Sequence, residues 1–574
     1  MDRNSSNKTA ATPRAGRFAA LFTPKLITVL REGYGLSHLR SDAISGLTVA
    51  IVALPLSMAI AIASGVSPAQ GLYAAIIGGF VVSLLGGSRF QIGGPAGAFI
   101  VLVAATLQQH GADGLILATM MSGAILIVTG YLRLGTYIKF IPYPVTIGFT
   151  AGIAVIILAS QLHNMLGLEL TGPEPSEFAP KIAALAEALP TANPFAIGLA
   201  AMTIAIILGF KAWKPHWPGL LIAVVVTSTA SALLQLPVAT IGTAFGGIPQ
   251  GLPAPSLPAL SLAKAVEVLP SAFAFALLGS IESLLSAVVA DGMTGRRHRS
   301  NCELVAQGAA NIASALFGGL CVTGAIARTA TNIRAGARSP VSGMLHSAFL
   351  LVFMLVAAPL ARFIPLAALG GILGVVAWNM AERHQFIGLL RASRGDALVL
   401  MATFLLTVFY DLTAGIVVGF ALGAILFINR MAQLAGIDRT SGGLVERDQA
   451  DDAERDHYDA ELARDPDIVV YRIRGVFFFG AASTVDSVLA SIADRHKAFI
   501  IDFSDVPLID STAANTIAAF ARKASAGPVR IILSGTNPTV RQLLESQHLT
   551  PPLVHYAASV EDAVTAARDE DSTE

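Results

Sequence analysis

The chain has 574 residues, of which 54% are hydrophobic and only 13% are charged, and its formal net charge is zero. Soluble proteins carry about a quarter charged residues, so this composition argues against a soluble protein and indicates a membrane protein. A net charge of zero gives no basic field for nucleic acid. The two cysteines, Cys302 and Cys321, supply neither a disulfide framework nor a metal site.

Four regions follow one another along the chain. Residues 1–40 are polar and basic and lack the apolar core and cleavage site of a signal peptide, so we interpret them as a cytoplasmic N-terminal segment. Residues 41–433 are mostly apolar and form the predicted transmembrane transport domain. Residues 434–467 are strongly charged and are predicted to be a linker, and residues 468–574 have the pattern of a soluble domain.

The apolar region divides into about fourteen segments, most of them near the 20 residues that a helix needs to cross a bilayer. Only helices and closed barrels satisfy their backbone groups in lipid, and these segments lack the strict alternation of barrel strands. We therefore predict a polytopic α-helical membrane protein. The predicted segments begin near residues 43, 68, 95, 113, 140, 194, 217, 264, 302, 324, 340, 364, 396 and 413.

The positive charges between these segments test the predicted orientation. If the N-terminus is cytoplasmic, thirteen Lys and Arg fall in cytoplasmic connections and three fall outside, namely Lys181, Lys264 and Arg362. This bias is what the positive-inside rule requires. We therefore expect a multi-pass protein of the cell (inner) membrane with both termini in the cytoplasm.

Two of the apolar segments are too short to cross a bilayer. Pro95 suits the first turn of a helix, and a helix from Pro95 to His110 would be roughly 24 Å long. About 230 residues later, a second short helix is expected from about Gly324 to Arg334. This layout favours two sets of about seven spans related as an inverted repeat, which secondary transporters commonly use.

Broken helices at mid-membrane place their N-termini near each other, and each N-terminus presents unpaired N–H groups and a partial positive charge. Two such ends predict an anion site. Arg328, about one turn into the second short helix, would add a full positive charge. The alternative is that Arg328 pairs with a carboxylate and only braces the helices; ionisable residues inside a membrane are more often functional.

Glu282 is the second ionisable group within an apolar segment. It suits a coupling site for H⁺, or for Na⁺ beside unwound backbone carbonyls. A structural alternative is an ion pair between Glu282 and Arg328.

After the linker, short apolar strands alternate with helical segments, which predicts a small α/β domain with a mainly parallel sheet. Either Asp510 or Ser511 is a plausible N-cap of a helix in this domain. The domain has no Gly-rich phosphate loop ending in Lys-Ser/Thr, so nucleotide hydrolysis is not supported.

The membrane region resembles the SulP family of sulfate permeases along nearly all of its length. The stretches that carry the resemblance are "GLTVAIVALPLSMAIAIASGVSPAQGLYAAIIGG", "GGPAGAF", "GSIESLLSAVVADGMTG", "NCELVAQGAANIASALFGG" and "TGAIARTATNIRAGARSPVSGM". The tail from Ile468 resembles a STAS domain, down to "DVPLIDSTAAN". The resemblance implies a core bundle and a gate bundle of helices, a homodimer with contacts between STAS domains, and a cytoplasmic protein partner for the STAS domain.

By the same resemblance, the substrate pocket comprises Leu56, Ile60, Pro95, Ala96, Gly97, Ile326, Ala327 and Arg328, and Glu282 occupies the position of the coupling carboxylate. Some family members have Ser or Thr where this chain has Ala327, so here the anion is left to backbone N–H groups and Arg328. The "DST" segment resembles one that is phosphorylated in sigma-factor regulators. For Ser511 we favour the role of an N-cap.

The resemblance implies a transporter that works by elevator-like alternating access, and neither an enzyme nor a cofactor other than a coupling H⁺ or Na⁺. The region from Gly93 to Gly123 most resembles the branch associated with C4-dicarboxylates such as succinate and fumarate, with sulfate and bicarbonate as alternatives. Two rival classes remain at this stage: an anion channel or voltage-responsive motor, and a membrane receptor that signals through its soluble tail.

Overall fold

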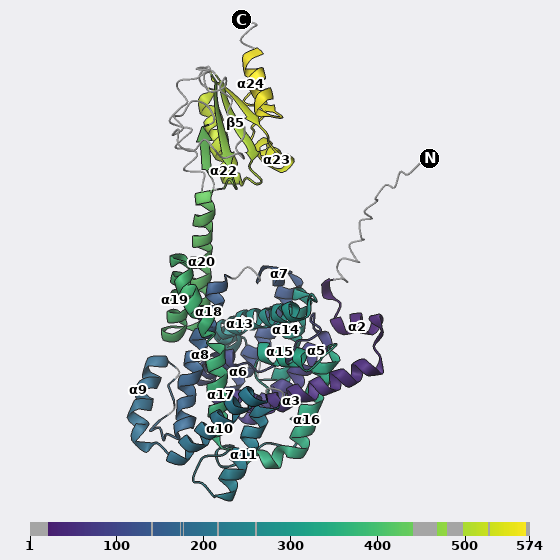
Figure 1. Ribbon diagram of the computed structural model, residues 1–574, viewed down its shortest axis with the longest axis vertical. Coiled ribbons are helices and arrows are strands. Elements are labelled where there is room, and N and C mark those ends of the chain that lie inside the picture. The colour runs from purple at the N-terminus through teal and green to yellow at the C-terminus, as the bar shows by residue number, and fades with distance from the viewer. Residues whose placement is uncertain are drawn as a thin grey trace. The chain divides into compact units, whose positions relative to one another are not determined.

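A computed structural model describes residues 21–138, 142–172, 174–175, 177–214, 217–258, 261–434, 436–439, 468–478, 498–525 and 529–569 (Figure 1). The chain divides into two compact units, residues 1–420 and 421–574. Most of the predicted linker, and the helical segment that the sequence predicts at residues 483–496, lie outside the described residues.

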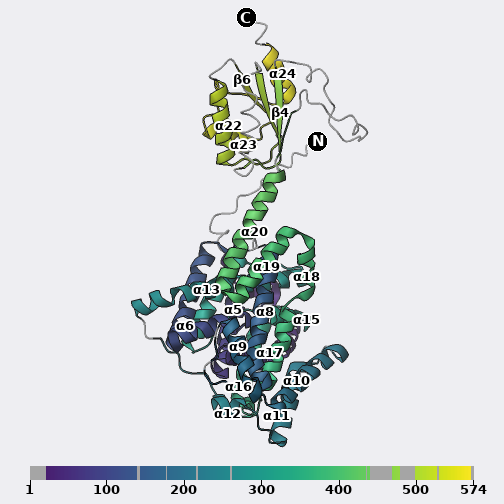
Figure 2. The ribbon, with the colours of Figure 1, turned by 90° about the vertical axis from the view of Figure 1, so that its left-hand side faces the viewer.

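The first unit is helical, and its helices pack in two groups. The core group consists of α3 (Leu36–Ala63), α4 (Pro68–Tyr73), α5 (Gly79–Leu85), α6 (Ile100–Tyr131), α13 (Leu262–Thr294), α14 (Ser300–Leu316), α15 (Ile326–Arg334) and α16 (Val341–Ala361). The gate group consists of α8 (Tyr143–Leu166), α9 (Phe178–Ala188), α10 (Pro194–Trp213), α11 (Gly219–Leu233), α17 (Leu366–Met380), α18 (Arg383–Ala392) and α19 (Arg394–Phe409). Within the gate group, α8 lies between α17 and α19 (Figure 2).

The remaining helices of the chain's first part are short or lie at its edges. They are α2 (Lys25–Gly33), α7 (Gly135–Ile138), α12 (Ile241–Phe245) and α20 (Leu412–Leu434). A π-helical turn at Ala74–Gly78 joins α4 to α5, and a 3₁₀ turn at Leu189–Thr191 follows α9.

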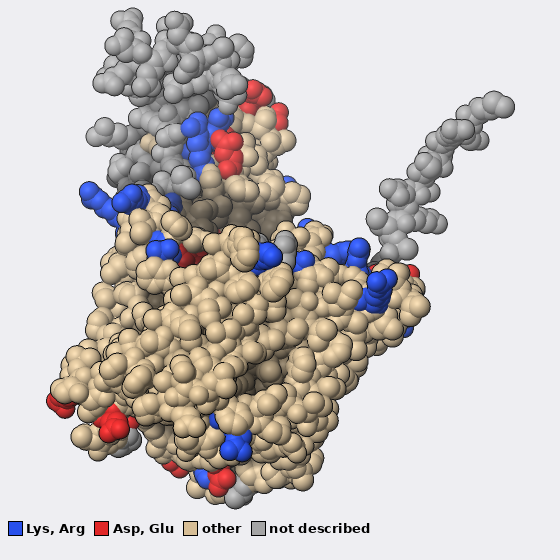
Figure 3. Space-filling model, turned by 60° about the horizontal axis from the view of Figure 1, so that its bottom comes forward, with Lys and Arg blue, Asp and Glu red and all other residues tan. Residues whose placement is uncertain are grey.

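Among the described residues, eight helices are long and apolar enough to cross a membrane. A broad part of the surface of the first unit carries almost no charged side chains, and Lys and Arg gather along one edge of it (Figure 3). A helix begins close to every predicted segment start except residue 113, which follows a break inside α6. Because several helices, such as α15 and α17, are shorter than a bilayer crossing, the number of fourteen spans stays a prediction.

Small residues allow the core helices to approach closely. A Cβ placed on Gly123 of α6 would overlap the backbone of α14 at Gly308, and a Cβ on Gly308 would overlap α6. Close approach through glycine is the usual means of packing helices in lipid, where no hydrophobic force drives them together.

Two irregular stretches interrupt the helices of the core group. Gly111 has φ 71° and ψ −176°, so α6 consists of a short first part that ends at His110 and a second part that follows. Two short strands, β1 (Gly93–Gly94) and β2 (Thr323–Gly324), pair antiparallel, with Gly93 opposite Gly324. Each strand leads directly into one of the two predicted short helices.

The second unit consists of one β-sheet with helices on both faces. Its five strands are β3 (Gly436–Arg439), β4 (Ile468–Arg474), β5 (Ala498–Asp505), β6 (Arg530–Ser534) and β7 (His555–Ala557), in that spatial order. The β3–β4 pair is antiparallel and the other pairs are parallel, which confirms the predicted mainly parallel sheet. The helices α22 (Ser511–Ala524) and α23 (Pro538–Ser546) cover one face, and α24 (Val560–Asp569) covers the other.

The structure differs from the sequence prediction at the start of this unit. Strand β3 lies inside residues 434–467, which were predicted to be a linker, and it pairs with β4 along its whole length. The sheet of the second unit therefore includes backbone that precedes Ile468. A strand of four residues among many charged residues gives too weak a sequence pattern to be distinguished from a linker.

Candidate anion-binding site

The antiparallel pair of β1 and β2 positions the beginnings of two helices. A 3₁₀ turn at Gly97–Phe99 follows β1 and opens α6, and α15 begins at Ile326, directly after β2. Since the strands run antiparallel, the two helices lead away from the pair in opposite directions. The backbone N–H of Ala325 donates to the carbonyl of Ile92 over 2.9 Å, which ties the second helix beginning to the first irregular stretch. The predicted meeting of two discontinuous helices is thus present.

Arg328 reaches across this meeting point. Its side chain is 1% exposed, and Nη2 donates to Ser57 Oγ on α3 (3.0 Å) and to the carbonyl of Pro95 (3.2 Å). Within the part of the chain that the structure describes, Nε and Nη1 are buried without a hydrogen-bond partner. A Cβ on Gly94 would overlap the guanidinium, so glycine is needed there to admit the arginine.

The two structural alternatives for Arg328 do not agree with this geometry. Among the described residues, Arg328 has no carboxylate partner and Glu282 forms no ion pair with it. A guanidinium held by one hydroxyl and one carbonyl keeps its charge and several donors for another acceptor.

A network of polar side chains supports the irregular backbone on the side of β2. Gln91 Nε2 donates to Ser283 Oγ over 2.7 Å, and Ser283 Oγ donates to Gln307 over 3.3 Å. Asn311 both donates to the carbonyl of Val322 (3.0 Å) and accepts from its N–H (2.8 Å). Backbone groups outside helices must be satisfied in this way within a membrane.

The predicted pocket residues gather around this point in different ways. Leu56 and Ile60 flank Ser57 on α3 and are buried, with 8% and 3% exposure. Pro95 and Ala96 are also buried, and Ala96 is the extended residue just before the 3₁₀ turn. Ile326 is half-buried and Ala327 is exposed, both in the first turn of α15.

Gly97 shows which surface the site faces. A Cβ built on Gly97 would lie 3.2 Å from Cδ1 of Ile157 on α8 and 3.7 Å from the sulfur of Met380, the last residue of α17. Both are gate helices, so the beginning of α6 lies at the boundary between the core and gate groups.

Glu282 lies on α13 at the same boundary. Glu282 is 8% exposed, and it lines a small cavity together with Val145, Thr146 and Thr150 of α8. The carboxyl group therefore faces the gate group rather than the arginine. A relative movement of the two groups would change its access to water.

Ser57 was missed in the sequence interpretation, although a polar residue between Leu56 and Met58 in an otherwise apolar helix is a usable signal. In the second unit, Ser511 does not cap its helix. The side chain of Asp510 accepts from Ala513 N over 2.8 Å, and Ser511 is an exposed first helical residue. Of the two N-caps that the sequence predicted, Asp510 is confirmed, and the role that we favoured for Ser511 is wrong because the carboxylate one residue earlier takes it.

Discontinuous helices that meet at a buried cation, at the boundary of two helix groups, define a polytopic membrane protein of the transporter class. The chain belongs to the sulfate permease family. The model of that family matches residues 39–403, and the model of the STAS domain matches residues 459–563. The family is one of transporters, so the protein is not an enzyme.

Several known proteins are similar to this chain. YvdB of Bacillus subtilis, whose name provisionally assigns it to sulfate transport, is 40% identical over 523 residues, covering 90% of this chain and 95% of YvdB. The bicarbonate transporter BicA of a Synechocystis species is 33% identical over 538 residues, covering 89% of this chain and 91% of BicA.

Two solved structures are also similar. The transmembrane domain of a cyanobacterial BicA has a TM-score of 0.61 at 35% identity, covering 67% of this chain and 98% of that domain. The structure of SLC26A9 has a TM-score of 0.83 at 18% identity, covering 97% of this chain and 94% of that one, and shows the common fold alone.

Proposed function

We propose that the protein is a secondary active transporter that carries a small oxyanion, sulfate or bicarbonate, across the cell membrane. The observation that carries this proposal is the buried Arg328, whose Nε and Nη1 have no partner among the described residues and which lies between the beginnings of α6 and α15. A planar guanidinium with free donors matches the oxygens of such an anion. The names of BicA and of YvdB support the same two anions.

The bound anion would accept hydrogen bonds from Arg328 and from backbone N–H groups of Gly97, Ile326 and Ala327. Ala327 has no hydroxyl, so in this chain the first turn of α15 contributes through its backbone alone. The apolar side chains of Leu56 and Ile60 would exclude water from one side and thereby strengthen these contacts.

The transport step in this proposal is an elevator-like movement of the core group against the gate group. Every side chain and backbone group assigned to the anion belongs to the core group, so the anion would travel with it. The division of the contacts into two groups, with few contacts between them, supports this mechanism.

Glu282 is the proposed coupling residue. It lies on a core helix and faces Thr146 and Thr150 of the gate, so it would exchange H⁺ with water in one position of the core and be sealed in another. Na⁺ is the alternative coupling ion, with the carboxylate and nearby hydroxyl groups as its ligands. H⁺-coupled uptake is the form we favour.

The assembly and orientation complete the proposal. We infer a homodimer in the inner membrane, with both termini cytoplasmic and with STAS domains in contact with each other or with a cytoplasmic protein. Lys and Arg gather along one edge of the first unit, and this supports the proposed orientation (Figure 3).

The test is an uptake competition panel in proteoliposomes that contain the full-length protein. Sulfate, bicarbonate, chloride, succinate and fumarate compete for uptake, with and without a pH gradient or a Na⁺ gradient. We expect sulfate or bicarbonate to compete best and an inward H⁺ gradient to accelerate uptake. The names of YvdB and BicA refer to sulfate and bicarbonate, so the C4-dicarboxylate prediction requires succinate or fumarate to compete best in this assay.

The same vesicles separate the rival classes. A channel would give conductance far beyond carrier turnover and no accumulation against a gradient. A receptor would give no uptake at all.

A further inference from the structure

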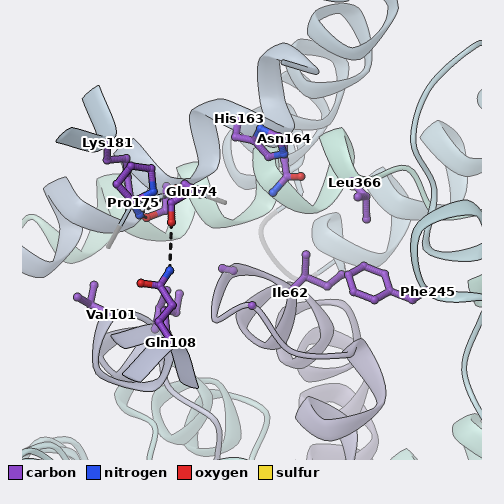
Figure 4. A pocket seen from close by; sticks show the side chains of 15 residues that line it. Ile62, Val101, Gln108, His163, Asn164, Glu174, Pro175, Lys181, Phe245 and Leu366 are labelled. Carbon is purple, nitrogen blue, oxygen red and sulfur yellow. Dashed lines mark hydrogen bonds and ion pairs between the residues drawn. The ribbon is translucent and has the colours of Figure 1, made fainter. Parts of the chain in front are cut away.

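A second polar cavity lies near the far end of the short first part of α6. It has a volume of about 270 Å³ and is lined by the end of α3, by α6, by the end of α8 and by residues that lead into α9 (Figure 4). Its polar lining side chains are Gln108, Ser160, His163, Asn164, Glu174 and Lys181. Ile100 and Val101, the first residues of α6, line it as well. The cavity therefore extends along the helix whose beginning forms the candidate anion site.

A buried cation lies in the wall of this cavity. The side chain of Lys181 is 9% exposed, its Nζ donates to Ser160 Oγ over 2.8 Å, and it lies 2.9 Å from Oε1 of Glu174. The side chain of Glu174 is 27% exposed and is thus the more accessible partner. A buried ammonium is costly unless an anion accompanies it. Glu174 supplies that anion from within the chain.

Further donors face the same space. His163 and Asn164 of α8 point into the cavity beside Leu366 (Figure 4). Nδ1 of His163 is buried and has no hydrogen-bond partner within the described ranges. An anion in the cavity would therefore have an ammonium, an amide and an imidazole within the same lining.

We propose that this cavity is a second anion subsite, in which Lys181 binds a small oxyanion and the carboxylate of Glu174 is the competitor that the oxyanion displaces. The subsite rests on the proposed function, since it would serve as the station through which the anion passes between the surface and Arg328. Displacement leaves the ammonium of Lys181 paired, because the oxyanion takes the place of the carboxylate, while the side chain of Glu174, at 27% exposure, can turn towards water.

The subsite also joins the two helix groups. Nε2 of Gln108, on the core helix α6, donates to the backbone carbonyl of Glu174 over 3.1 Å, and Glu174 precedes the gate helix α9 (Figure 4). Lys181 and Ser160 belong to the gate helices α9 and α8. A movement of the core against the gate would therefore part Gln108 from Glu174 and leave Lys181, Ser160, His163 and Asn164 together on the gate, as expected of a station that stays on one side of the membrane.

The charge of the cavity can be measured without any transport. A cysteine introduced as Ala104→Cys, in the lining of the cavity, is reacted in the full-length protein with an anionic methanethiosulfonate reagent and with a cationic one. The two native cysteines are buried, and the protein without the introduced cysteine gives the background. The ratio of the two rates reports the local potential.

We expect the anionic reagent to react faster, and sulfate to slow that reaction while leaving the cationic one unchanged. Lys181→Met lowers the ratio of anionic to cationic rates by about tenfold, and Glu174→Gln raises it by a similar factor. Lys264→Met is the matched control, because Lys264 pairs with Asp113 at 3.7 Å and does not line the cavity. It leaves the ratio unchanged.

Three results would overturn the subsite: equal ratios in all variants, shifts of the same sign in Lys181→Met and Glu174→Gln, or no reaction of the introduced cysteine with either reagent. In parallel, Lys181→Met is expected to raise the KM for sulfate uptake several-fold with little change in kcat. If the parent protein transports neither sulfate nor bicarbonate, the proposed function fails, while the rate ratios still decide whether the cavity binds anions.

Discussion

The strongest prediction concerns the removal of the guanidinium in Arg328→Ala. In the structure Nη2 is used by Ser57 and Pro95, while Nε and Nη1 are free among the described residues to bind the anion. A hydrogen bond to a charged group contributes about 1.5–3 kcal/mol. The loss of two such bonds amounts to about 3–6 kcal/mol, which weakens the Kd of the anion by about 10²- to 10⁴-fold.

The assay is equilibrium binding of radiolabelled sulfate to the purified full-length protein. Arg328→Lys retains the charge but lacks the planar fork, so its Kd is expected between those of the parent and of Arg328→Ala. Ser57→Ala is the control for local packing, because it removes one partner of Nη2 and leaves the free donors in place. All variants are compared by size-exclusion profile, so that a misfolded protein is recognised.

The outcome that would refute the reasoning is a Kd for Arg328→Ala within about threefold of the parent value, in a protein with an unchanged elution profile. The anion would then be held elsewhere, and the buried arginine would serve only to join α3 to the turn at Pro95.

Glu282→Gln is expected to remove the dependence of sulfate uptake on an H⁺ gradient, while the Kd for sulfate stays within about threefold of the parent value. Asp291→Asn is the control, because Asp291 lies on the same helix but is bonded to His298, and this variant is expected to keep the dependence on the gradient. Ala96→Phe fills the space beside the 3₁₀ turn, so both binding and uptake are lost in a protein of normal elution profile; retained uptake would place the pocket elsewhere. Asp510→Ala lowers the free energy of unfolding of the second unit by about 1 kcal/mol, measured by urea titration, whereas Ser511→Ala changes it by less than about 0.5 kcal/mol. Burial raises the pKa of Tyr556 to about 12, and its neutral phenol donates a hydrogen bond to the carbonyl of Leu549 over 2.9 Å. The contribution of this phenol to the free energy of unfolding is therefore complete below pH 10 and is lost as the pH rises towards 12. In alkaline unfolding, the Tyr556→Phe variant is expected to lack this loss of stability.

The positions of the helices could be predicted because a membrane helix is recognised from the hydrophobicity of its own residues. Long apolar runs, interrupted by Gly and Pro, located nearly every helix beginning, and Gly93, Gly94 and Pro95 correctly marked an irregular approach to a short helix. Hydrophobicity and backbone propensity are properties of neighbouring residues, so one sequence is sufficient to reveal them.

Contacts between distant segments could not be predicted in the same way. Ser57 and Arg328 are 271 residues apart, and the pairing of β3 with β4 depends on a sheet that forms across a long connection. Lys181 was assigned to an outer connection, but the fold buries it against Ser160 and Glu174. Nothing in the residues next to a lysine shows whether its partner lies in water or in a cavity.

The buried guanidinium is the point at which fold and function meet. An arginine in hydrocarbon is expensive, and two hydrogen bonds from Nη2 offset only part of that cost. The helix beginnings of α6 and α15 add positive potential, which makes the same place still less favourable for an isolated cation. Gly94 leaves room for the side chain, and the hydrogen bonds of Asn311 to Val322 hold the backbone that precedes β2, but neither supplies a negative charge. A bound anion would supply an acceptor for the unpaired donors and would cancel the repulsion, so the proposed substrate would stabilise the folded core group when it binds.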